Sequence, residues 1–360
     1  MTSSDPVPVR DDIADLEPYG APQLDVPVRL NTNETAEPPP PGYLEEVGRR
    51  IQSLELNRYP DRPHTALRER LGTRAGIDPA GVWAANGSNE VLSQLFQAYG
   101  GPGRRVATVR PGYSMYPVIA QVTLTDYVTV DLDDDLAWSD DVVDALGATD
   151  PDIVILANPN NPTGIAVPDG IVRQVHDACA RALVIVDEAY IEFAGDADAV
   201  TAADLLGDLD RLVVSRTFSK AFRLAGLRLG YLLTHQWVVD GIRRVRLPYH
   251  LDAIKQVAAE VALDQEDAFL EHRSRVAAER DRVAAALTQI GGVQQWPSAA
   301  NFILFRVADA AHVFDALLEH GVLVRDFSTK PRLEGCLRVT VGTRDENDAF
   351  LAALADVLGA

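Results

Sequence analysis

The sequence predicts an α/β fold, with a large, mostly parallel sheet covered by helices on both faces and a smaller α+β domain after it. Short apolar runs alternate with helical patterns from about residue 66 onward, and continuous apolar runs are typical of strands buried on both faces. After about Pro248 the alternation stops, which indicates a second domain. The clearest strand-like runs are residues 152–156, 182–186, 212–214 and 229–233.

The last third of the chain has its own order of expected elements. A long helical stretch is expected first, and shorter strands and helices follow it. In chain order these elements are a helical stretch over 253–289, a strand over 302–305, a helix over 312–319, strands over 322–324 and 337–341, and a helix over 345–358. We therefore expect a large domain over residues 36–248 and a small domain over residues 249–360.

Residues 1–35 are expected to form an arm that lies on another part of the protein. They are rich in proline and acidic residues, and the prolines at 38–41 exclude regular helix and central strand just after them. The sequence has no apolar stretch of about 18 residues and no signal-peptide pattern. Cys179 and Cys336 are isolated, so neither a disulfide nor a metal site is indicated, and a cytoplasmic location is expected.

The charge of the chain restricts its partners. A formal net charge of -20 opposes nonspecific binding to nucleic acid and to anionic membranes. An anionic substrate must then be bound by local arginines. Only three lysines are present, Lys220, Lys255 and Lys330, so any Schiff-base chemistry must use one of them.

Polar clusters follow the predicted strands, where open α/β sheets bind their ligands. Residues 158–164, after the first run, contain two prolines and a glycine that fix a turn and orient an Asn amide. Asp187 follows the second run and places a carboxylate at a strand end. Taken alone, the first cluster is an ordinary turn and Asp187 is a helix N-cap.

The third cluster, residues 215–222 with Arg228 nearby, contains hydroxyls, a lysine and arginines. Lys220 can form an imine with an aldehyde, while the hydroxyls and Arg228 suit a phosphate. Lys220 is the only lysine that we expect in such a cluster. The alternative is a basic loop with no ligand.

The fourth cluster, residues 85–90, precedes an amphipathic helical pattern. The apolar residues of that pattern are Leu92, Leu95, Phe96 and Tyr99. Free amides at a helix N-terminus bind anions, and Gly87 allows close approach of a phosphate. By itself the cluster could also be a simple helix cap.

Together the four clusters supply what pyridoxal phosphate (PLP) requires. A lysine holds the aldehyde, a carboxylate keeps the ring nitrogen protonated, and a cradle binds the phosphate. The joint occurrence favours a PLP-dependent enzyme over four unrelated turns.

With these motifs the chain resembles the histidinol-phosphate aminotransferases, PLP-dependent transferases of fold type I, from about Tyr19 to Phe350. The resemblance implies transfer of an amino group between L-histidinol phosphate and 2-oxoglutarate in histidine biosynthesis. It also implies catalytic roles for Lys220, which would carry PLP as a Schiff base, for Asp187 at the pyridine nitrogen and for Tyr190 at the ring hydroxyl. The remaining implied cofactor contacts are Asn161 at the ring hydroxyl, Tyr113 stacked on the ring, and Ser88, Asn89, Thr217, Ser219 and Arg228 at the phosphate.

The resemblance further implies a homodimer, because Tyr59 of Arg58-Tyr59-Pro60-Asp61 would reach the phosphate bound by the neighbouring subunit. The substrate would be bound by Tyr19 of the arm, which also reaches the neighbouring site, and by Asn161, Arg325 and Arg338. Both arginines adjoin apolar runs, where a charge needs an anionic partner. An internal salt bridge is the alternative for each arginine.

Alternative activities remain open at this point. Thr35 and Ala36 stand where the family commonly has Asn-Pro, and Glu-Thr at this place also occurs in aromatic-amino-acid aminotransferases. Residues 247–251 resemble the histidinol-phosphate branch more than the aromatic one. A PLP-dependent phospho-amino-acid decarboxylase and a catalytically silent PLP-binding regulator share this fold, and fold alone does not separate them.

Overall fold

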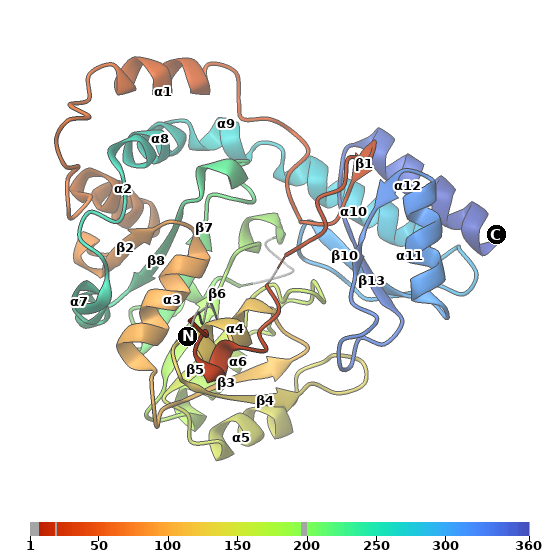
Figure 1. The fold of residues 1–360 in the computed structure, drawn as a ribbon, viewed down its shortest axis with the longest axis horizontal. Coiled ribbons are helices and arrows are strands. Elements are labelled where there is room, and N and C mark those ends of the chain that lie inside the picture. The colour runs from red at the N-terminus through yellow and green to blue at the C-terminus, as the bar shows by residue number, and fades with distance from the viewer. Residues whose placement is uncertain (1–6, 19, 196–199, 360) are drawn as a thin grey trace, which may run out of the picture.

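A seven-stranded sheet forms the centre of the molecule (Figure 1). The structure is a computed structural model that describes residues 7–18, 20–195 and 200–359. β8 runs antiparallel to both of its neighbours and all other pairs are parallel, which confirms the expected mostly parallel sheet. In spatial order the strands are β2 (Val82–Ala85), β8 (Gly230–Thr234), β7 (Leu212–Thr217), β6 (Leu183–Asp187), β5 (Ile153–Ala157), β3 (Arg105–Arg110) and β4 (Asp126–Asp131).

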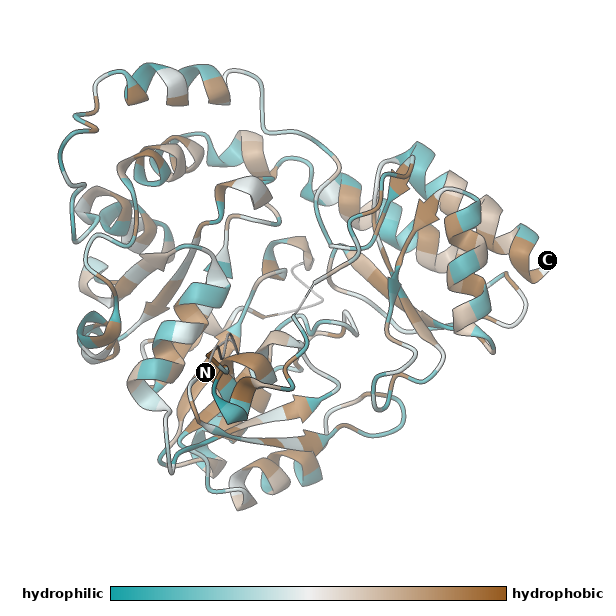
Figure 2. Ribbon diagram, viewed as in Figure 1, coloured by the Kyte–Doolittle hydropathy of each residue, from teal (hydrophilic) through white to brown (hydrophobic). Residues whose placement is uncertain are grey.

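Both faces of this sheet are buried, as the continuous apolar runs predicted. Alternate residues of one strand belong to two separate apolar cores: Ile153 and Ile155 to one, Val154 and Leu156 to the other. Figure 2 shows apolar residues along these strands and mixed polarity on the helices. One core is covered by α1 (Tyr43–Ile51), α2 (Thr65–Ala75), α5 (Asp140–Ala148), α6 (Ile171–Ala178) and α8 (Ala253–Asp264), and the other by α3 (Ser88–Tyr99), α4 (Met115–Val122) and α7 (Gln236–Val245).

A second, antiparallel sheet lies beside the first, at the right of Figure 1. Its spatial order is β12 (Arg325–Asp326), β13 (Cys336–Thr340), β10 (Phe302–Arg306) and β9 (Gln294–Gln295). Its apolar core is closed by α10 (Arg273–Leu287), α11 (Ala310–Glu319) and α12 (Arg344–Leu358). The arm contributes β1 (Val28–Arg29), which pairs in parallel with β11 (Val322–Leu323) next to this core.

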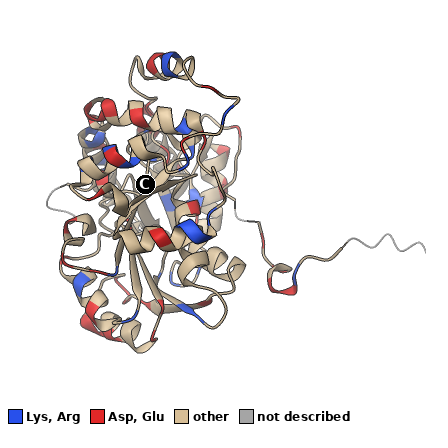
Figure 3. Ribbon diagram, turned by 90° about the vertical axis from the view of Figure 1, so that its left-hand side faces the viewer, with Lys and Arg blue, Asp and Glu red and all other residues tan. Residues whose placement is uncertain are grey.

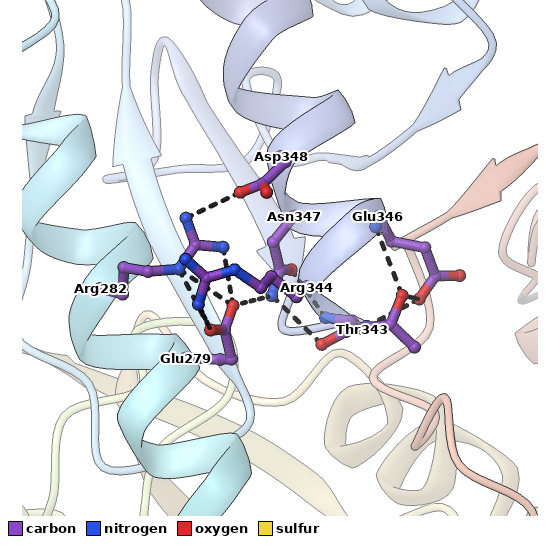
Figure 4. Close-up of polar contacts among 8 residues, drawn as sticks. Glu279, Arg282, Thr343, Arg344, Glu346, Asn347 and Asp348 are labelled. Carbon is purple, nitrogen blue, oxygen red and sulfur yellow. Dashed lines mark hydrogen bonds and ion pairs between the residues drawn. The ribbon is translucent and has the colours of Figure 1, made fainter.

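A polar cluster holds α10 against the start of α12 (Figure 4). Glu279 of α10 accepts hydrogen bonds from Arg282 at 2.7 Å and from the Asn347 side chain of α12 at 3.1 Å. Thr343 and Glu346 form a capping box that begins α12. The two helices are therefore fixed relative to each other at one end of the second sheet.

The helical stretch expected over 253–289 is three helices, and the expectation of one continuous stretch was wrong. α8 ends at Asp264, α9 (Glu266–Leu270) follows, and α10 begins at Arg273. The breaks have a tertiary cause, because α8 contacts α1 and α2 whereas α10 contacts α12 and β10. His272, fully buried, marks the second break. The predicted domain boundary near residue 248 stays a prediction.

The excess of acidic residues is distributed over several helices in the view of Figure 3. Within the ranges that the structure describes, no helix is long and apolar enough to cross a membrane.

Candidate active site

A cavity of about 380 Å³ lies at the carboxyl ends of β5, β6 and β7. Its wall also includes arm residues 31–34 and residues of the second sheet, so the cavity lies where the two sheets and the arm meet. The predicted site residues that line it are Ser88, Asn89, Tyr113, Asn161, Asp187, Tyr190, Thr217, Ser219, Lys220, Arg228, Arg325 and Arg338. Tyr19 lies outside the described residues, and Tyr59 is not among the lining residues.

Asp187 is the last residue of β6, and its carboxylate is buried. Its Oδ2 accepts a hydrogen bond of 3.1 Å from the hydroxyl of Tyr116, while its Oδ1 has no partner among the described residues. Burial raises the pKa of Asp187 to about 7. A buried carboxylate oxygen of this kind favours a protonated nitrogen as its partner, which would restore the ionised form.

Lys220 follows β7, and its side chain crosses to the arm. Its Nζ donates a hydrogen bond of 2.9 Å to the carbonyl oxygen of Thr32. Burial, assisted by the charges of Arg338 and Arg228, lowers the pKa of Lys220 to about 7. A large fraction of this amine is therefore neutral near pH 7, which is the form that attacks an aldehyde.

An anion cradle lies where α3 begins. Gly87 has a φ of 90°, and Ser88 and Asn89 open the helix. The positive φ of Gly87 favours glycine, and a Cβ there would lie 2.9 Å from the guanidinium of Arg228 and displace it. Nη1 of Arg228 donates to the hydroxyl of Ser219 at 3.2 Å. Helix amides, a hydroxyl and a guanidinium thus converge, as a phosphate requires.

Tyr113 and Thr217, two further predicted cofactor residues, form hydrogen bonds with neighbouring residues of the site. The Tyr113 hydroxyl donates to Oδ1 of Asn89 at 3.3 Å. The Thr217 hydroxyl accepts from the amide of Ser219 at 3.0 Å and donates to the carbonyl oxygen of Leu229 at 3.3 Å. Thr217 therefore shapes the turn that carries Ser219 and Lys220.

Arg338, on β13 of the second sheet, is a buried residue of the cavity wall. Its Cζ lies 5.0 Å from the ring centroid of Phe302 and 5.2 Å from that of Phe327. Nη1 donates to Oδ1 of Asn161 at 2.5 Å, and Nη2 donates to the carbonyl oxygen of Asn31 at 2.9 Å. These contacts fix the plane of the guanidinium, as bidentate binding of an oxyanion requires.

Arg325 pairs with Arg338 across β12 and β13. Its Nη1 donates to the carbonyl oxygen of Gly20 at 3.3 Å, and it forms no ion pair within the described part of the chain. The salt-bridge alternative is therefore wrong for Arg325 as far as the described residues extend. Two guanidinium groups at one wall suit a substrate with an oxyanion.

Tyr116 and Asn33 contact the predicted catalytic residues, and the sequence reasoning missed both. Tyr116 lies in the first turn of α4, three residues after Tyr113, which precedes the helix. This spacing could have indicated that the two side chains share a face. Asn33 donates through its Nδ2 to the Tyr190 hydroxyl at 3.0 Å, and no pattern in the sequence indicates this contact.

Of the three lysines, Lys220 lines this cavity, and Lys255 and Lys330 do not. Nζ of Lys255, at the start of α8, donates to Oδ1 of Asn86 at 2.7 Å, directly before the anion cradle. Lys255 is also paired with Asp252 at 3.3 Å and does not line the cavity. Lys255 therefore contacts the residue before the cradle, whereas Lys220 lines the cavity itself.

Tyr59 is 78% exposed and stacks on Tyr249, with ring centroids 4.2 Å apart and an interplanar angle of 12°. The pair lies outside the cavity of its own chain. An exposed aromatic pair of this kind is typical of a surface that contacts another protein.

Comparison with known proteins agrees with this arrangement. The model of the family "Aminotransferase class I and II" matches residues 26–354. Histidinol-phosphate aminotransferase of Frankia casuarinae is 46% identical over 99% of this chain and 91% of that protein, and the enzyme of Thermobifida fusca is 45% identical over 99% and 97%. The chain thus has nearly full-length relatives of one name.

Solved structures agree on the fold. Histidinol-phosphate aminotransferase of Sinorhizobium meliloti, in complex with pyridoxal-5'-phosphate, has a TM-score of 0.89 at 27% identity and covers 99% of both chains. L-threonine-O-3-phosphate decarboxylase of Porphyromonas gingivalis has a TM-score of 0.81 at 22% identity, covering 92% of this chain and all of that one. The second likeness shows the fold alone.

Proposed function

The chain belongs to the aminotransferase class I and II family, and we propose that it transfers an amino group between L-histidinol phosphate and 2-oxoglutarate. The products are imidazole acetol phosphate and L-glutamate, in a step of histidine biosynthesis. One observation carries the proposal: Lys220, Asp187 with its unpartnered Oδ1, and the cradle around Arg228 line a single cavity. Relatives of this name that are 45–46% identical support it.

The residues of this cavity fit PLP. When bound, PLP supplies an aldehyde for imine formation and a ring that withdraws electrons. Lys220 would bind the aldehyde and then move a proton between the substrate carbon and the cofactor. Asp187 would keep the ring nitrogen protonated through Oδ1. Arg228 and Ser219 would hold the phosphate together with the first amides of α3.

Substrate recognition is assigned to the part of the cavity wall that β12 and β13 contribute. Arg325 and Arg338 would bind the phosphate of histidinol phosphate in one half-reaction and a carboxylate of glutamate in the other. Asn161 would contact both the cofactor ring hydroxyl and the substrate. Tyr19 of the arm, which lies outside the described residues, would bind the substrate in the neighbouring subunit.

A homodimer completes the proposed site. The exposed Tyr59 would reach the phosphate bound by the neighbouring subunit, and Tyr19 would also reach across. A heterodimer tests this arrangement: one protomer carries Tyr59→Ala, and the other carries Lys220→Ala. The heterodimer has one site with neither change and one with both, so the purified heterodimer should retain about half of the wild-type activity although both parent homodimers are weak. Equal inactivity of the heterodimer would contradict the exchange of Tyr59.

Amino-donor profiling with 2-oxoglutarate as acceptor tests the substrate. Histidinol phosphate should have the highest kcat/KM among histidinol phosphate, phenylalanine, tyrosine and O-phosphothreonine. A preference for phenylalanine or tyrosine would favour an aromatic aminotransferase instead. Release of CO₂ from O-phosphothreonine without 2-oxoglutarate would favour a decarboxylase. The cytoplasmic location expected from the sequence stays a prediction.

A further inference from the structure

The phenolic oxygen of Tyr190 accepts hydrogen bonds from two buried amides. Nδ2 of Asn161 lies 3.3 Å from it and Nδ2 of Asn33 lies 3.0 Å from it. Each amide is held in turn from β13: Arg338 donates to Oδ1 of Asn161, and the Thr340 hydroxyl donates to Oδ1 of Asn33 at 3.2 Å. Two chains of hydrogen bonds thus connect β13 to the hydroxyl oxygen of Tyr190, one through Asn161 and the other through Asn33.

The route through Asn33 is fixed at every polar atom of that residue. Its backbone N–H donates to the Thr340 hydroxyl at 3.0 Å, and its carbonyl oxygen accepts from Nδ2 of Asn301 at 3.2 Å. Asn33 has a φ of 56°, a left-handed conformation that asparagine adopts more readily than most residues. Asn33 is 1% exposed. A buried residue whose own polar groups are all paired is held in one orientation.

These contacts determine what the Tyr190 hydroxyl can offer to a ligand. Two N–H groups donate to the phenolic oxygen, so Tyr190 contacts an anionic ring oxygen by donating its own proton. Tyr190 lines the cavity, and Nζ of Lys220 lies 5.7 Å from the centroid of its ring. An anionic ring oxygen bound beside Lys220 is stabilised by such a proton.

The two routes differ in how they respond to a substrate. The Asn161 route ends at Arg338, which lines the cavity and would be shared with a substrate oxyanion. The Asn33 route ends at Thr340, which is buried and does not belong to the described cavity wall. Binding of an anion therefore competes with the first route and leaves the second unchanged.

We propose that Asn33 is a positioning residue for the cofactor, which keeps the Tyr190 hydroxyl directed at the cofactor ring oxygen whether or not Arg338 holds a substrate. Thr340 acts through Asn33: its hydroxyl binds Oδ1 of the Asn33 side chain, so Nδ2 is the atom that faces Tyr190. The inference rests on the proposed PLP site, and it adds a residue of the Leu30-Asn31-Thr32-Asn33-Glu34 segment to that site.

The test is a pH titration of the visible absorbance of the holoenzyme. A hydrogen bond donated to the ring oxygen favours the form of the cofactor in which that oxygen is anionic, so its loss moves the titration to higher pH. Asn33→Gly retains the left-handed backbone and removes the amide. Its midpoint should rise by roughly 0.5 to 1 pH unit, the effect of one hydrogen bond. Thr340→Val should shift the midpoint in the same direction, and Thr340→Ser should restore it.

A double variant and a matched control complete the design. If Thr340 acts through Asn33, Thr340→Val adds little to Asn33→Gly. Asn301→Ala loosens the backbone of the same segment without removing the Asn33 amide, so it should leave the midpoint near that of the wild type. An unchanged midpoint in Asn33→Gly, or an equal rise in Asn301→Ala, overturns the inference. Thr340→Val serves alone if Asn33→Gly does not fold. A wild-type protein that binds no PLP would instead refute the proposed function.

Discussion

The hydroxyl of Tyr116 donates to Oδ2 of Asp187 at 3.1 Å, and the other carboxylate oxygen, Oδ1, is buried with no hydrogen-bond partner among the described residues. Tyr116 is fully buried in α4, on the face of the large sheet that α3 also covers. Its hydrogen bond stabilises the ionised form of Asp187 and opposes the effect of burial. Tyr116 therefore prepares the carboxylate for a cationic partner.

Tyr116→Phe should weaken PLP binding by about tenfold, because the loss of one hydrogen bond to a charged group costs about 1.5 kcal/mol. Equilibrium dialysis against PLP measures the change. Tyr99→Phe is the control, since Tyr99 bonds only to backbone carbonyl oxygens of α7 outside the cavity. Equal affinities in the two variants would remove Tyr116 from the proposed site.

The stability of the cofactor-free protein should depend on pH through Asp187. Burial raises the pKa of Asp187 from 3.8 to about 7, so the folded state binds a proton that the unfolded state releases. The contribution of the protonated group is present below about pH 4 and is lost as the pH rises through about 7. Without PLP, Asp187→Asn should therefore have a higher Tm than the wild type at pH 8, and the two Tm values should converge at pH 4. If the difference in Tm between the two proteins were the same at pH 4 and pH 8, the raised pKa of Asp187 would be contradicted.

Asp187→Asn should also separate binding from turnover. The amide has nearly the same size and still accepts from Tyr116, so PLP binds. A neutral amide does not keep the ring nitrogen protonated, and proton abstraction should slow by a factor on the order of 100 or more. Single-turnover kinetics with histidinol phosphate measure this step, and near-native rates would exclude Asp187 from the mechanism.

Lys220→Ala should abolish both turnover and the absorbance of the cofactor imine. In the wild type, borohydride reduction followed by peptide mapping should find the label on Lys220. Lys255→Ala is the informative control, because Lys255 contacts Asn86 beside the cradle but does not line the cavity. It should retain the imine with somewhat weaker PLP binding. A label on Lys255 or Lys330 would refute the assignment.

Much of the fold could be predicted because its signals are local. Runs such as residues 182–186 are apolar on both faces, and the structure buries β6 completely. The break between α9 and α10 could not be predicted, since no Gly or Pro marks it. His272 is held at this break by a contact with the nearby carbonyl oxygen of Phe269 and by a hydrogen bond from Arg223, which is distant in the sequence.

The residues of the site also fall into those that the sequence indicated and those that it did not. Asp187 and Lys220 follow strands directly, so the strand pattern indicated their common edge. Asn33 and Thr340 are separated by 307 residues and meet only because the arm crosses the cavity beside β13. Such contacts depend on tertiary packing and leave no periodic signal in the sequence.

Arg338→Lys should weaken both substrates while keeping the charge. The guanidinium contacts the rings of Phe302 and Phe327 and is held in plane by Asn161 and Asn31, whereas an ammonium has neither the plane nor the fork. The expected loss is roughly 1.5 to 3 kcal/mol, the range for a hydrogen bond to a charged group, and it should appear mainly in kcat/KM. Unchanged kcat/KM values for both substrates would contradict the role.

Arg325→Ala gives the sharper test of substrate class, because it compares two donors in one variant. Arg325 lies at the arm side of the cavity and has no ion pair among the described residues, so its charge is available for a ligand. If it binds the substrate phosphate, kcat/KM for histidinol phosphate should fall by at least about tenfold more than that for phenylalanine. Phenylalanine ends in a carboxylate that Arg338 alone can bind. Equal losses for the two donors would show that Arg325 has no phosphate-specific role, and the aromatic aminotransferase would become the better assignment.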